Sequence, residues 1–548
     1  MYLFVPKKIL AFCICIFFVL PIVAQQNANA DTLVRAGKTI FVIGADRLNS
    51  QTIDSANKFL SLVGKAKVQQ ENTFFDADSI VLNQVDNSLE AFGNIHINDA
   101  DSVHTYAQYL KYVGKEKKAY LSKKVRLTDG KGILTTDDLV YDVQLKIGTY
   151  SNGGKVVNGK TVLTSKEGYY YGETRDVYFK KKVVLNDPDF KIYTDTLLYN
   201  LNTEISTFVC PTKIINGKRT ITTSDGLYDV KNKKAYFNKR PFIDDSTYTF
   251  TADKAAIDDK TGLSEYAGNA VYRSKDSVSG YDLIAGNIKL NKATNTFLAT
   301  QKPLLFLKQE KDTIYITADT LFSSKLSELL KTRNVHSIRP INTDSIPVLA
   351  KKDTNNNRFF EAYYHVKIFS DSLQAVCDSM FYSLEDSVFR LYKNPVAWSQ
   401  ENQITGDTLF LFTENKKPQQ LLVYENAMSV QKVGELYFNQ IKGNSITALF
   451  SDGKIDSLRA KGNAETVYYG QDEQNKFIGV NKANCDVIDM YFQRQKDRST
   501  AQKIVLRNNL EGTAYPMRQV NHETLRLKNF QWLIQKRPKT KFDILLAE

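Results

Sequence analysis

Apolar and polar residues alternate along most of the chain, as they do in β-strands that bury one face. The alternation is clearest in short segments in which Thr or Ala precedes Asp and apolar residues follow at every second position. We expect these apolar residues to point into a common interior. In chain order they are Ile80 and Leu82, Leu110 and Tyr112, Leu139 and Tyr141, Tyr169 and Tyr171, Leu197 and Tyr199, Ile288 and Leu290, Met380 and Tyr382, and Leu409 and Leu411.

The same segments recur at a regular spacing. Their Asp, or the residue in its place, falls at positions 46, 78, 108, 137, 167, 195, 225, 253, 286 and 319, so that successive copies are 28 to 33 residues apart. A second pattern, Ala-x-Gly-Asn-apolar, follows half a repeat later, with clear copies at 91–95 and 460–464. One such unit cannot bury its own apolar face. The spacing therefore predicts an all-β stack of antiparallel repeats of about 30 residues.

The recurring Asp and the Gly-Asn pair have a structural interpretation. The carboxylate accepts a backbone N–H where the strand begins, as in an Asx turn. The Gly-Asn pair supplies positive φ at a bulge or corner. The sharper alternative is a ladder of carboxylates that binds calcium, but that requires closely spaced Asp and Gly residues, which this chain lacks. We expect no metal at these positions.

The repeats also divide the chain into segments. They stop after Asp319 and resume 59 residues later at Asp378, and the residues between are polar with two prolines. Within them, Leu326, Leu329 and Leu330 have a helical spacing. The expected segments are a signal peptide (1–24), a first β segment (25–323), a linker or insertion (324–358), a second β segment (359–520) and a basic C-terminal tail (521–548), which either caps the last repeat or forms a mobile arm.

The first 24 residues have the pattern of a secretory signal. Lys7 and Lys8 precede an apolar run from Ile9 to Leu20, and Ala24 ends a plausible cleavage site. The alternative is an uncleaved anchor, but the run is shorter than the ~20 residues needed to cross a bilayer. No later apolar segment approaches that length. We expect an exported protein.

Composition agrees with an exported β protein. The chain holds 31 Phe and 30 Tyr, residues that favour strands. Its formal net charge is +13, and removal of residues 1–24 takes away two lysines and no acid, which leaves +11. Outside the cytosol, a basic surface favours anionic lipid head groups and phosphorylated sugars over nucleic acid. Cys210, Cys377 and Cys485 are far apart and odd in number, so we expect buried thiols and no disulfide framework.

The sequence carries no recognisable catalytic or cofactor site. It has no nucleophile elbow, no Gly-rich phosphate loop and no CxxC motif. The acidic residues recur once per repeat, as structural residues do. His96 and His104 flank Asp99 and Asp101, but a solvated loop explains this cluster better than a metal site. We expect no enzyme activity, no cofactor and no metal.

The paired patterns resemble the OstA-like family. That family includes the periplasmic lipopolysaccharide transport protein LptA and the soluble N-terminal domain of the outer-membrane translocon LptD. Residues 40–100 and 250–275 carry the closest matches, and a weaker lattice covers most of 40–323 and 359–515. The resemblance implies a stacked antiparallel β-jelly roll, V-shaped in section, that lies in the periplasm or at the outer membrane. It also implies transport of lipopolysaccharide without chemistry.

On this resemblance, the apolar stripe lines a groove for acyl chains. The groove candidates are Ile80, Leu82, Leu110, Tyr112, Leu139, Tyr141, Leu197, Tyr199, Ile288, Leu290, Met380, Tyr382, Leu409 and Leu411. Basic clusters at the strand corners, at 123–124, 180–182 and at Lys239 and Arg240, would meet lipid phosphates at the rim; a solvated turn is the alternative for any single cluster. Open edge strands would pair with other transport components or with a second copy. Three alternatives stay open: an ordinary packed core, a structural or adhesive surface β-solenoid, and a repeat-built polysaccharide-active enzyme.

Overall fold

The computed structural model describes most of the chain. The described residues are 40–53, 58–70, 72–83, 85–99, 103–277, 280–308, 313–335, 358–414, 417–451, 454–472, 474, 476–494 and 499–545. The predicted signal peptide and most of the predicted insertion, at 336–357, lie outside them.

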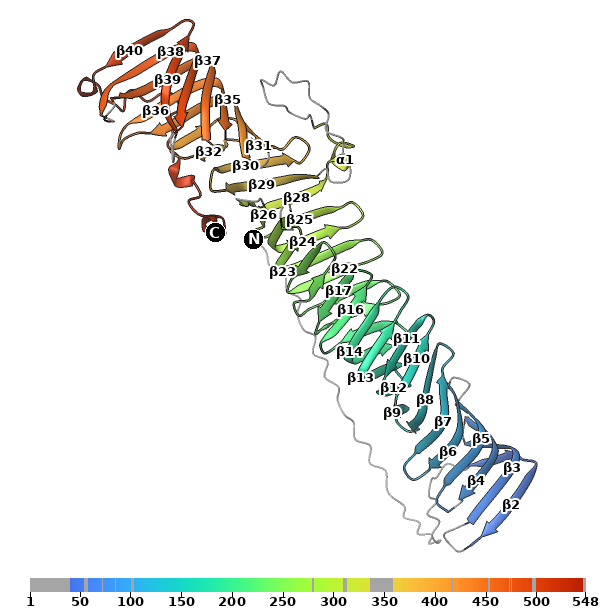
Figure 1. The fold of residues 1–548 in the computed structure, drawn as a ribbon. Coiled ribbons are helices and arrows are strands. Elements are labelled where there is room, and N and C mark those ends of the chain that lie inside the picture. Colours follow the sequence, from blue (N-terminus) through green and yellow to red (C-terminus); the bar gives the residue numbers. More distant parts are fainter. Residues whose placement is uncertain are drawn as a thin grey trace, which may run out of the picture.

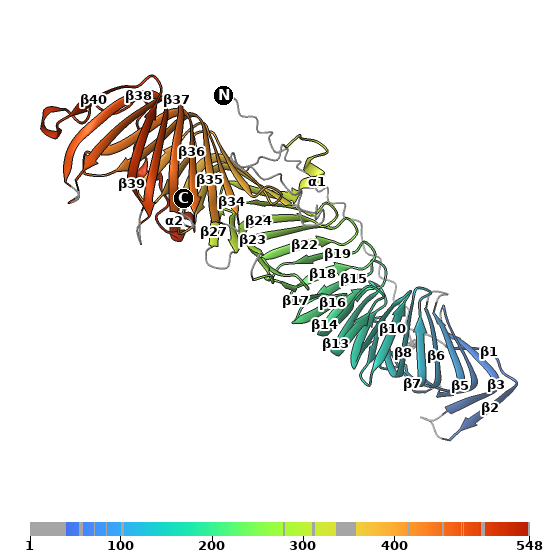
Figure 2. The same ribbon diagram turned by 45° about the horizontal axis from the view of Figure 1, so that its top comes forward.

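The protein is nearly all β, with 69% strand and 3% helix. Its strands stack in one continuous antiparallel ladder that forms a long rod, from β1 and β2 at one end to β39 and β40 at the other (Figures 1 and 2). The predicted fold class, a stack of antiparallel β repeats, is therefore confirmed. No helix among the described residues is long and apolar enough to cross a membrane.

Many strands run across the full width of the stack. They are β3 (Lys58–Gln70), β4 (Thr73–Asn83), β5 (Ser88–Asp99), β6 (Val103–Val113), β7 (Lys118–Thr128), β8 (Gly132–Asp142), β13 (Asp176–Asn186), β14 (Lys191–Asn200), β23 (Leu263–Ser274), β24 (Tyr281–Asn291), β29 (Arg358–Phe369), β30 (Gln374–Ser383), β35 (Lys417–Lys432), β36 (Phe438–Ser451), β37 (Lys454–Gln471) and β38 (Phe477–Arg494).

Elsewhere the chain breaks halfway, and each half is a separate strand. These are β1 (Phe41–Gly44), β2 (Arg47–Thr52), β9 (Ile147–Tyr150), β10 (Gly154–Asn158), β11 (Thr161–Ser165), β12 (Glu167–Tyr171), β15 (Ile205–Phe208), β16 (Thr212–Asn216), β17 (Arg219–Thr223), β18 (Gly226–Asp229), β19 (Lys234–Phe237), β20 (Phe242–Asp244), β21 (Tyr248–Thr251), β22 (Lys254–Asp258), β25 (Thr296–Thr300), β26 (Leu304–Lys308), β27 (Thr313–Thr317), β28 (Thr320–Lys325), β31 (Val388–Tyr392), β32 (Val396–Ser399), β33 (Asn402–Thr405), β34 (Thr408–Glu414), β39 (Ser499–Arg507) and β40 (Glu511–Tyr515).

A corner at the middle of each strand folds the stack into two facing arms. In β23 the register shifts between Ala267 and Ala270, where Gly268 and Asn269 have φ of 76° and 45°. The N–H of Asp253 donates to the carbonyl of Gly268 over 2.8 Å. The Gly-Asn pair therefore provides positive φ at a bulge, as predicted. The Asp carboxylate differs from the prediction, because it accepts the Asn269 side-chain amide rather than a backbone N–H.

The outer end of each arm is a row of tight turns. Edge A is formed by the turns at 114–117, 143–146, 172–175, 201–204, 230–233, 259–262 and 292–295; edge B is formed by those at 129–131, 159–160, 187–190, 217–218 and 245–247. Asx turns shape edge A: Asp142 Oδ1 accepts the N–H groups of Gln144 and Leu145 over 3.0 and 2.8 Å. The space between edge A and edge B is the mouth of the wedge.

The ladder continues past the predicted insertion. β28 pairs with β29, with Thr320 opposite Tyr363, so the strands before and after residues 324–358 belong to one sheet system. The predicted helical face forms α1 (Leu326–Leu329), whose Leu326 is buried with Phe359 and Phe381.

The C-terminal residues 516–545, here called the strap, lie on the outer face of earlier strands. They contain η1 (Met517–Gln519), η2 (Ile534–Lys536) and α2 (Lys541–Leu545). The amide of Gln403 donates to the carbonyl of Gln531 and accepts the N–H of Leu533, both over 2.7 Å. Gln403 faces outward because its neighbour Ile404 belongs to the interior cluster. The tail is therefore neither a mobile arm nor a cap confined to the last repeat.

Candidate functional site

The space between the two arms is filled by one hydrophobic cluster that extends along the stack, from Leu62 in β3 to Met490 in β38. Each repeat contributes the inward side chains of its two arms. Aliphatic and aromatic side chains, with Cys377 and Cys485, make up this cluster, so its chemistry is that of an apolar binding surface or a packed core.

The fourteen groove candidates all belong to this interior. Eleven of them are buried, and Tyr141, Leu290 and Tyr382 are partly buried and pack against the same cluster. The stripe pair Tyr169 and Tyr171 was predicted wrongly: Tyr170 is buried and its two neighbours face outward. The corner in that repeat lies at Lys166, one residue before the Glu167 landmark, and a slip of one residue exchanges the two faces of a strand.

Aromatic side chains from opposite arms meet inside the wedge. Phe250 stacks on Tyr266 with ring centroids 3.7 Å apart, and Phe190 contacts Tyr228 edge-on at 4.5 Å. Burial raises the pKa of Tyr199 to about 12, so its phenol remains protonated. That hydroxyl accepts the side-chain amide of Asn158 from the other arm over 3.2 Å. In these repeats the interior is filled by the protein's own side chains.

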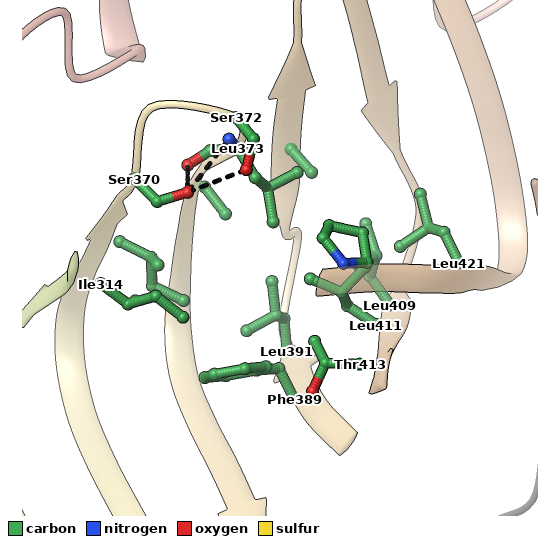
Figure 3. Close-up of a pocket in the computed structure, with 14 residues that line it drawn as sticks. Ile314, Ser370, Ser372, Leu373, Phe389, Leu391, Leu409, Leu411, Thr413 and Leu421 are labelled. Atoms are coloured by element: carbon green, nitrogen blue, oxygen red, sulfur yellow. Dashed lines mark hydrogen bonds between the residues drawn. The ribbon is translucent and has the colours of Figure 1, made fainter. Parts of the chain in front are cut away.

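A small apolar cavity lies at the mouth further along the stack (Figure 3). It is bounded on one side by the β29–β30 turn and on the other by the end of β34 and the start of β35. Its volume is about 40 Å³, little more than the ~30 Å³ share of one water molecule. It is lined by Ile314, Ile368, Ser370, Ser372, Leu373, Ala375, Phe389, Leu391, Ala397, Leu409, Leu411, Thr413, Pro418 and Leu421.

Two of the sequence candidates, Leu409 and Leu411, line this cavity, and the other twelve do not. Sequence reasoning missed Phe389 and Leu391, although they alternate along β31 in the same way. The alternation on the second strand of each repeat was the available signal. The polar groups at the cavity are hydroxyls, at Ser370, Ser372 and Thr413, which suit an uncharged part of an amphiphile.

Ion pairs join the two edges across the mouth in the middle of the stack. Arg175 on edge A lies 3.5 Å from Asp129 on edge B. Lys233 on edge A lies 2.5 Å from Asp189. A third pair has the opposite polarity, with its cation near edge B and its acid on edge A.

Arg219, at the start of β17 beside edge B, donates to Asp259 on edge A over 2.9 and 3.1 Å. Burial alone would lower the pKa of the Arg219 guanidinium, but the Asp259 carboxylate outweighs that effect and the net shift is upward. This pair therefore stays charged while it is partly buried.

The lysine clusters expected at the rim lie elsewhere. Lys123, Lys124, Lys181 and Lys182 have positive φ and are exposed at the corner, on the opposite side of the wedge from the mouth. Lys181 pairs there with Glu167 over 2.6 Å. The clusters therefore lie at the strand corners, as the sequence predicts, but these corners are bulges halfway along the strands and do not form the rim of the mouth.

His96 and His104 meet on the outer face rather than in a loop. Their Nε2 and Nδ1 atoms are 3.0 Å apart, and Asp76 lies 3.7 Å from His96. Desolvation, followed by the nearby His104, lowers the pKa of His96. Among the described residues, no group of three or more His, Cys, Asp or Glu side chains has the arrangement of a metal site.

Comparisons with known proteins give a family match over the first part of the chain. Residues 37–195 and 191–253 match the family model described as OstA-like protein. No curated protein matches the chain. The matching solved structures include LptH of Pseudomonas aeruginosa, described as the LptA-homologous periplasmic component of the lipopolysaccharide transport device. The two share 18% identity with a TM-score of 0.18, over 20% of this chain and 80% of that one.

Proposed function

Because the chain is OstA-like over residues 37–253, we propose that it binds lipopolysaccharide or a related glycolipid in the periplasm and passes it toward the outer membrane. The observation that carries this proposal is the apolar interior that continues along the stack and reaches the mouth at Leu409 and Leu411. Transfer along such an interior is a binding function and requires no catalytic group.

The energy available to such a groove is large. Burial of one CH₂ contributes ~0.8 kcal/mol, so an acyl chain of about a dozen carbons gains on the order of 10 kcal/mol. This gain offsets the cost of separating side chains that pack against one another in the lipid-free wedge.

The wedge must open before it binds, because its cavity of about 40 Å³ is far too small for an acyl chain. The way the mouth is closed supports such opening. Among the described residues, strand pairing stays within each arm, and side chains alone join edge A to edge B. Side-chain contacts separate at much lower cost than a β ladder does.

The partners that the ends of the stack fit are other β-jelly-roll components of the transport machinery. In the described part of the chain, β1 and β2 pair only with β3, and β39 and β40 pair only with β38. Phe41 and Ile43 of β1 are more than half exposed. A free edge with apolar side chains favours strand addition. We propose that β1 and β2 receive a strand from a neighbouring component; a second copy of this chain is the alternative partner.

Native mass spectrometry of the protein purified from the envelope of cells that make lipopolysaccharide tests the proposal. We expect adducts with the mass of a glycolipid that disappear after detergent exchange. Protein that carries no lipid, and that takes up none when incubated with lipopolysaccharide, would favour the structural or adhesive solenoid instead.

A further inference from the structure

We infer that the ion pairs Arg175–Asp129, Lys233–Asp189 and Arg219–Asp259 are latches that hold the mouth closed, and that an anionic glycolipid opens them by pairing its phosphates with their cations. The inference rests on the proposed lipid-binding function. It adds which charged groups recognise the phosphates of the ligand, and how the mouth opens to let the lipid enter.

The placement of the pairs distinguishes them from ordinary surface ion pairs. Each joins edge A to edge B, so each ties together the free ends of two arms that have no strand pairing across the mouth in the described residues. Their partners are 40 to 46 positions apart in the sequence, which is more than one repeat. A latch therefore also fixes the stagger of one arm against the other.

Burial shows that two of the latches, Arg175–Asp129 and Arg219–Asp259, close the interior directly, whereas Lys233 and Asp189 are about half exposed. The Asp129 side chain is 2% exposed, and Arg219 and Asp259 are 18% and 23% exposed. Asp129 and Asp259 also act on the buried phenols of Tyr170 and Tyr228, whose pKa values are raised first by burial and then by these carboxylates. The aromatic layer inside the wedge thus lies immediately beneath the latches, and a lipid that enters there must part them.

The cations suit the phosphates of a glycolipid. A guanidinium forms two parallel hydrogen bonds to a phosphate, as it does to a carboxylate, and an ammonium binds phosphate as a point charge. Exchange of a carboxylate partner for a phosphate partner keeps the cation paired while the arms separate. An uncharged lipid offers no such exchange.

The chain contains a matched control. Lys275 and Asp244 are 2.6 Å apart and 43% and 47% exposed, close to the 2.5 Å and the 45% and 52% of Lys233 and Asp189. Both members of the control pair lie on the edge B side, so their ion pair does not cross the mouth. Asp244→Asn therefore removes an equivalent charge pair without removing a latch.

The test measures how fast the full mature chain takes up two probes, purified lipopolysaccharide and its dephosphorylated form, at matched concentrations. Asp189→Asn with Asp259→Asn removes the acids of two latches and leaves the cations free. We expect this variant to load both probes about threefold faster or more. Asp244→Asn should load both at the wild-type rate.

A variant without the latch cations distinguishes opening of the mouth from recognition of the lipid phosphates. Lys233→Gln with Arg219→Gln also removes two latches but leaves no cation for phosphate. We expect it to load the dephosphorylated probe faster than wild type and the phosphorylated probe no faster. Equal acceleration of both probes by the cation variant would overturn the exchange of partners.

Rates of both latch variants equal to those of Asp244→Asn would overturn the latches themselves. Equilibrium binding of lipopolysaccharide to the wild-type protein is measured first. This measurement distinguishes a failure of the proposed function from a failure of the inference. If wild type binds and the variants do not differ, the inference alone fails. If wild type binds neither probe, the proposed function fails and the inference with it.

Discussion

Asn269 donates its side-chain amide to Asp253 across the corner of the wedge, with 2.9 Å between Nδ2 and Oδ2. The same bond joins Asn94 to Asp78 and Asn426 to Asp407, each over 3.0 Å. The two sequence patterns that recur half a repeat apart are therefore the two halves of one clamp. The clamp holds the bulge that turns a flat ladder into two facing arms.

Loss of the clamp should destabilise the stack in a graded way. Asp253→Ala removes the exposed hydrogen bonds from Asn269 and Arg240 and should lower the free energy of unfolding by about 0.5–1.5 kcal/mol. Gly268→Ala should lower it more, because a Cβ there lies 2.6 Å from Asp253 Oδ2 at a φ of 76°. Gly217→Ala is the control, since its φ is 58° but no atom lies within 4 Å of the added Cβ. Urea unfolding measures all three; equal effects of the two glycine variants would contradict the clamp.

These clamps explain how much of the fold the sequence reveals. A bulge needs positive φ and a partner at a fixed position, so residues such as Asp253 and Gly268 recur visibly at the repeat spacing. The alternation of apolar and polar residues along the strand then places Ile80 and Leu82 in the interior between the two arms. Where the landmark is degenerate, as at Glu167, the corner shifts by one residue and the predicted faces are exchanged.

The mouth could not be predicted in the same way. Arg219 and Asp259 are brought together by the stagger of two arms, and no local spacing in the sequence encodes a contact between residues 40 positions apart. The strap was missed for a related reason. Its anchors, Gln374, Gln403 and Gln440, are polar residues at outward positions that become buried only when the tail covers them.

The strap should depend on its buried glutamines. Gln403 is 1% exposed, and Gln403→Ala leaves the buried indole N–H of Trp398 without its partner, as well as the strap's Gln531 carbonyl and Leu533 N–H. Each unpaired buried group costs about 1–3 kcal/mol. We expect faster hydrogen exchange throughout 521–545 and a lower midpoint of unfolding. Gln144→Ala, at an exposed turn, should change neither; unaltered exchange in Gln403→Ala would show that the strap is held by its apolar side chains alone.

The last repeats should lose stability in acid. The Asp489 carboxylate is 4% exposed and contacts Arg459 and Arg507. The hydrogen bond from Arg459, against the opposing effect of burial, lowers the pKa of Asp489 below its ordinary 3.8. Its contribution is therefore complete above pH 3.8 and is lost as the pH falls through the lower folded value.

Comparison of wild type with Asp489→Asn tests this pH dependence. The variant should be less stable than wild type at pH 7, and the difference should shrink below pH 3.8 as the wild-type carboxylate takes up a proton. Unfolding of residues 454–507 followed by hydrogen exchange at pH 7 and pH 3 provides the measurement. A difference that stays constant with pH would rule out the ionised carboxylate as its source.

The free edge at β1 should be needed for contact with a neighbouring component. Adjacent N–H groups in a strand point to opposite sides, so either Val42→Pro or Ile43→Pro removes a donor that faces away from β3. Both side chains are exposed, and the downstream core should remain intact. We expect that one of the two variants reduces cross-linking to the partner with little change in thermal stability. Full cross-linking by both folded variants would exclude strand addition at β1.

Photo-cross-linking from β34 detects lipid contact inside the wedge. A photoreactive phenylalanine derivative at Leu411 faces the cavity, whereas the same group at Phe410 faces the outer surface. With lipopolysaccharide bound, we expect a covalent glycolipid adduct from position 411 and only background from position 410. Adducts of equal yield at both positions, or adducts from position 410 alone, would contradict it.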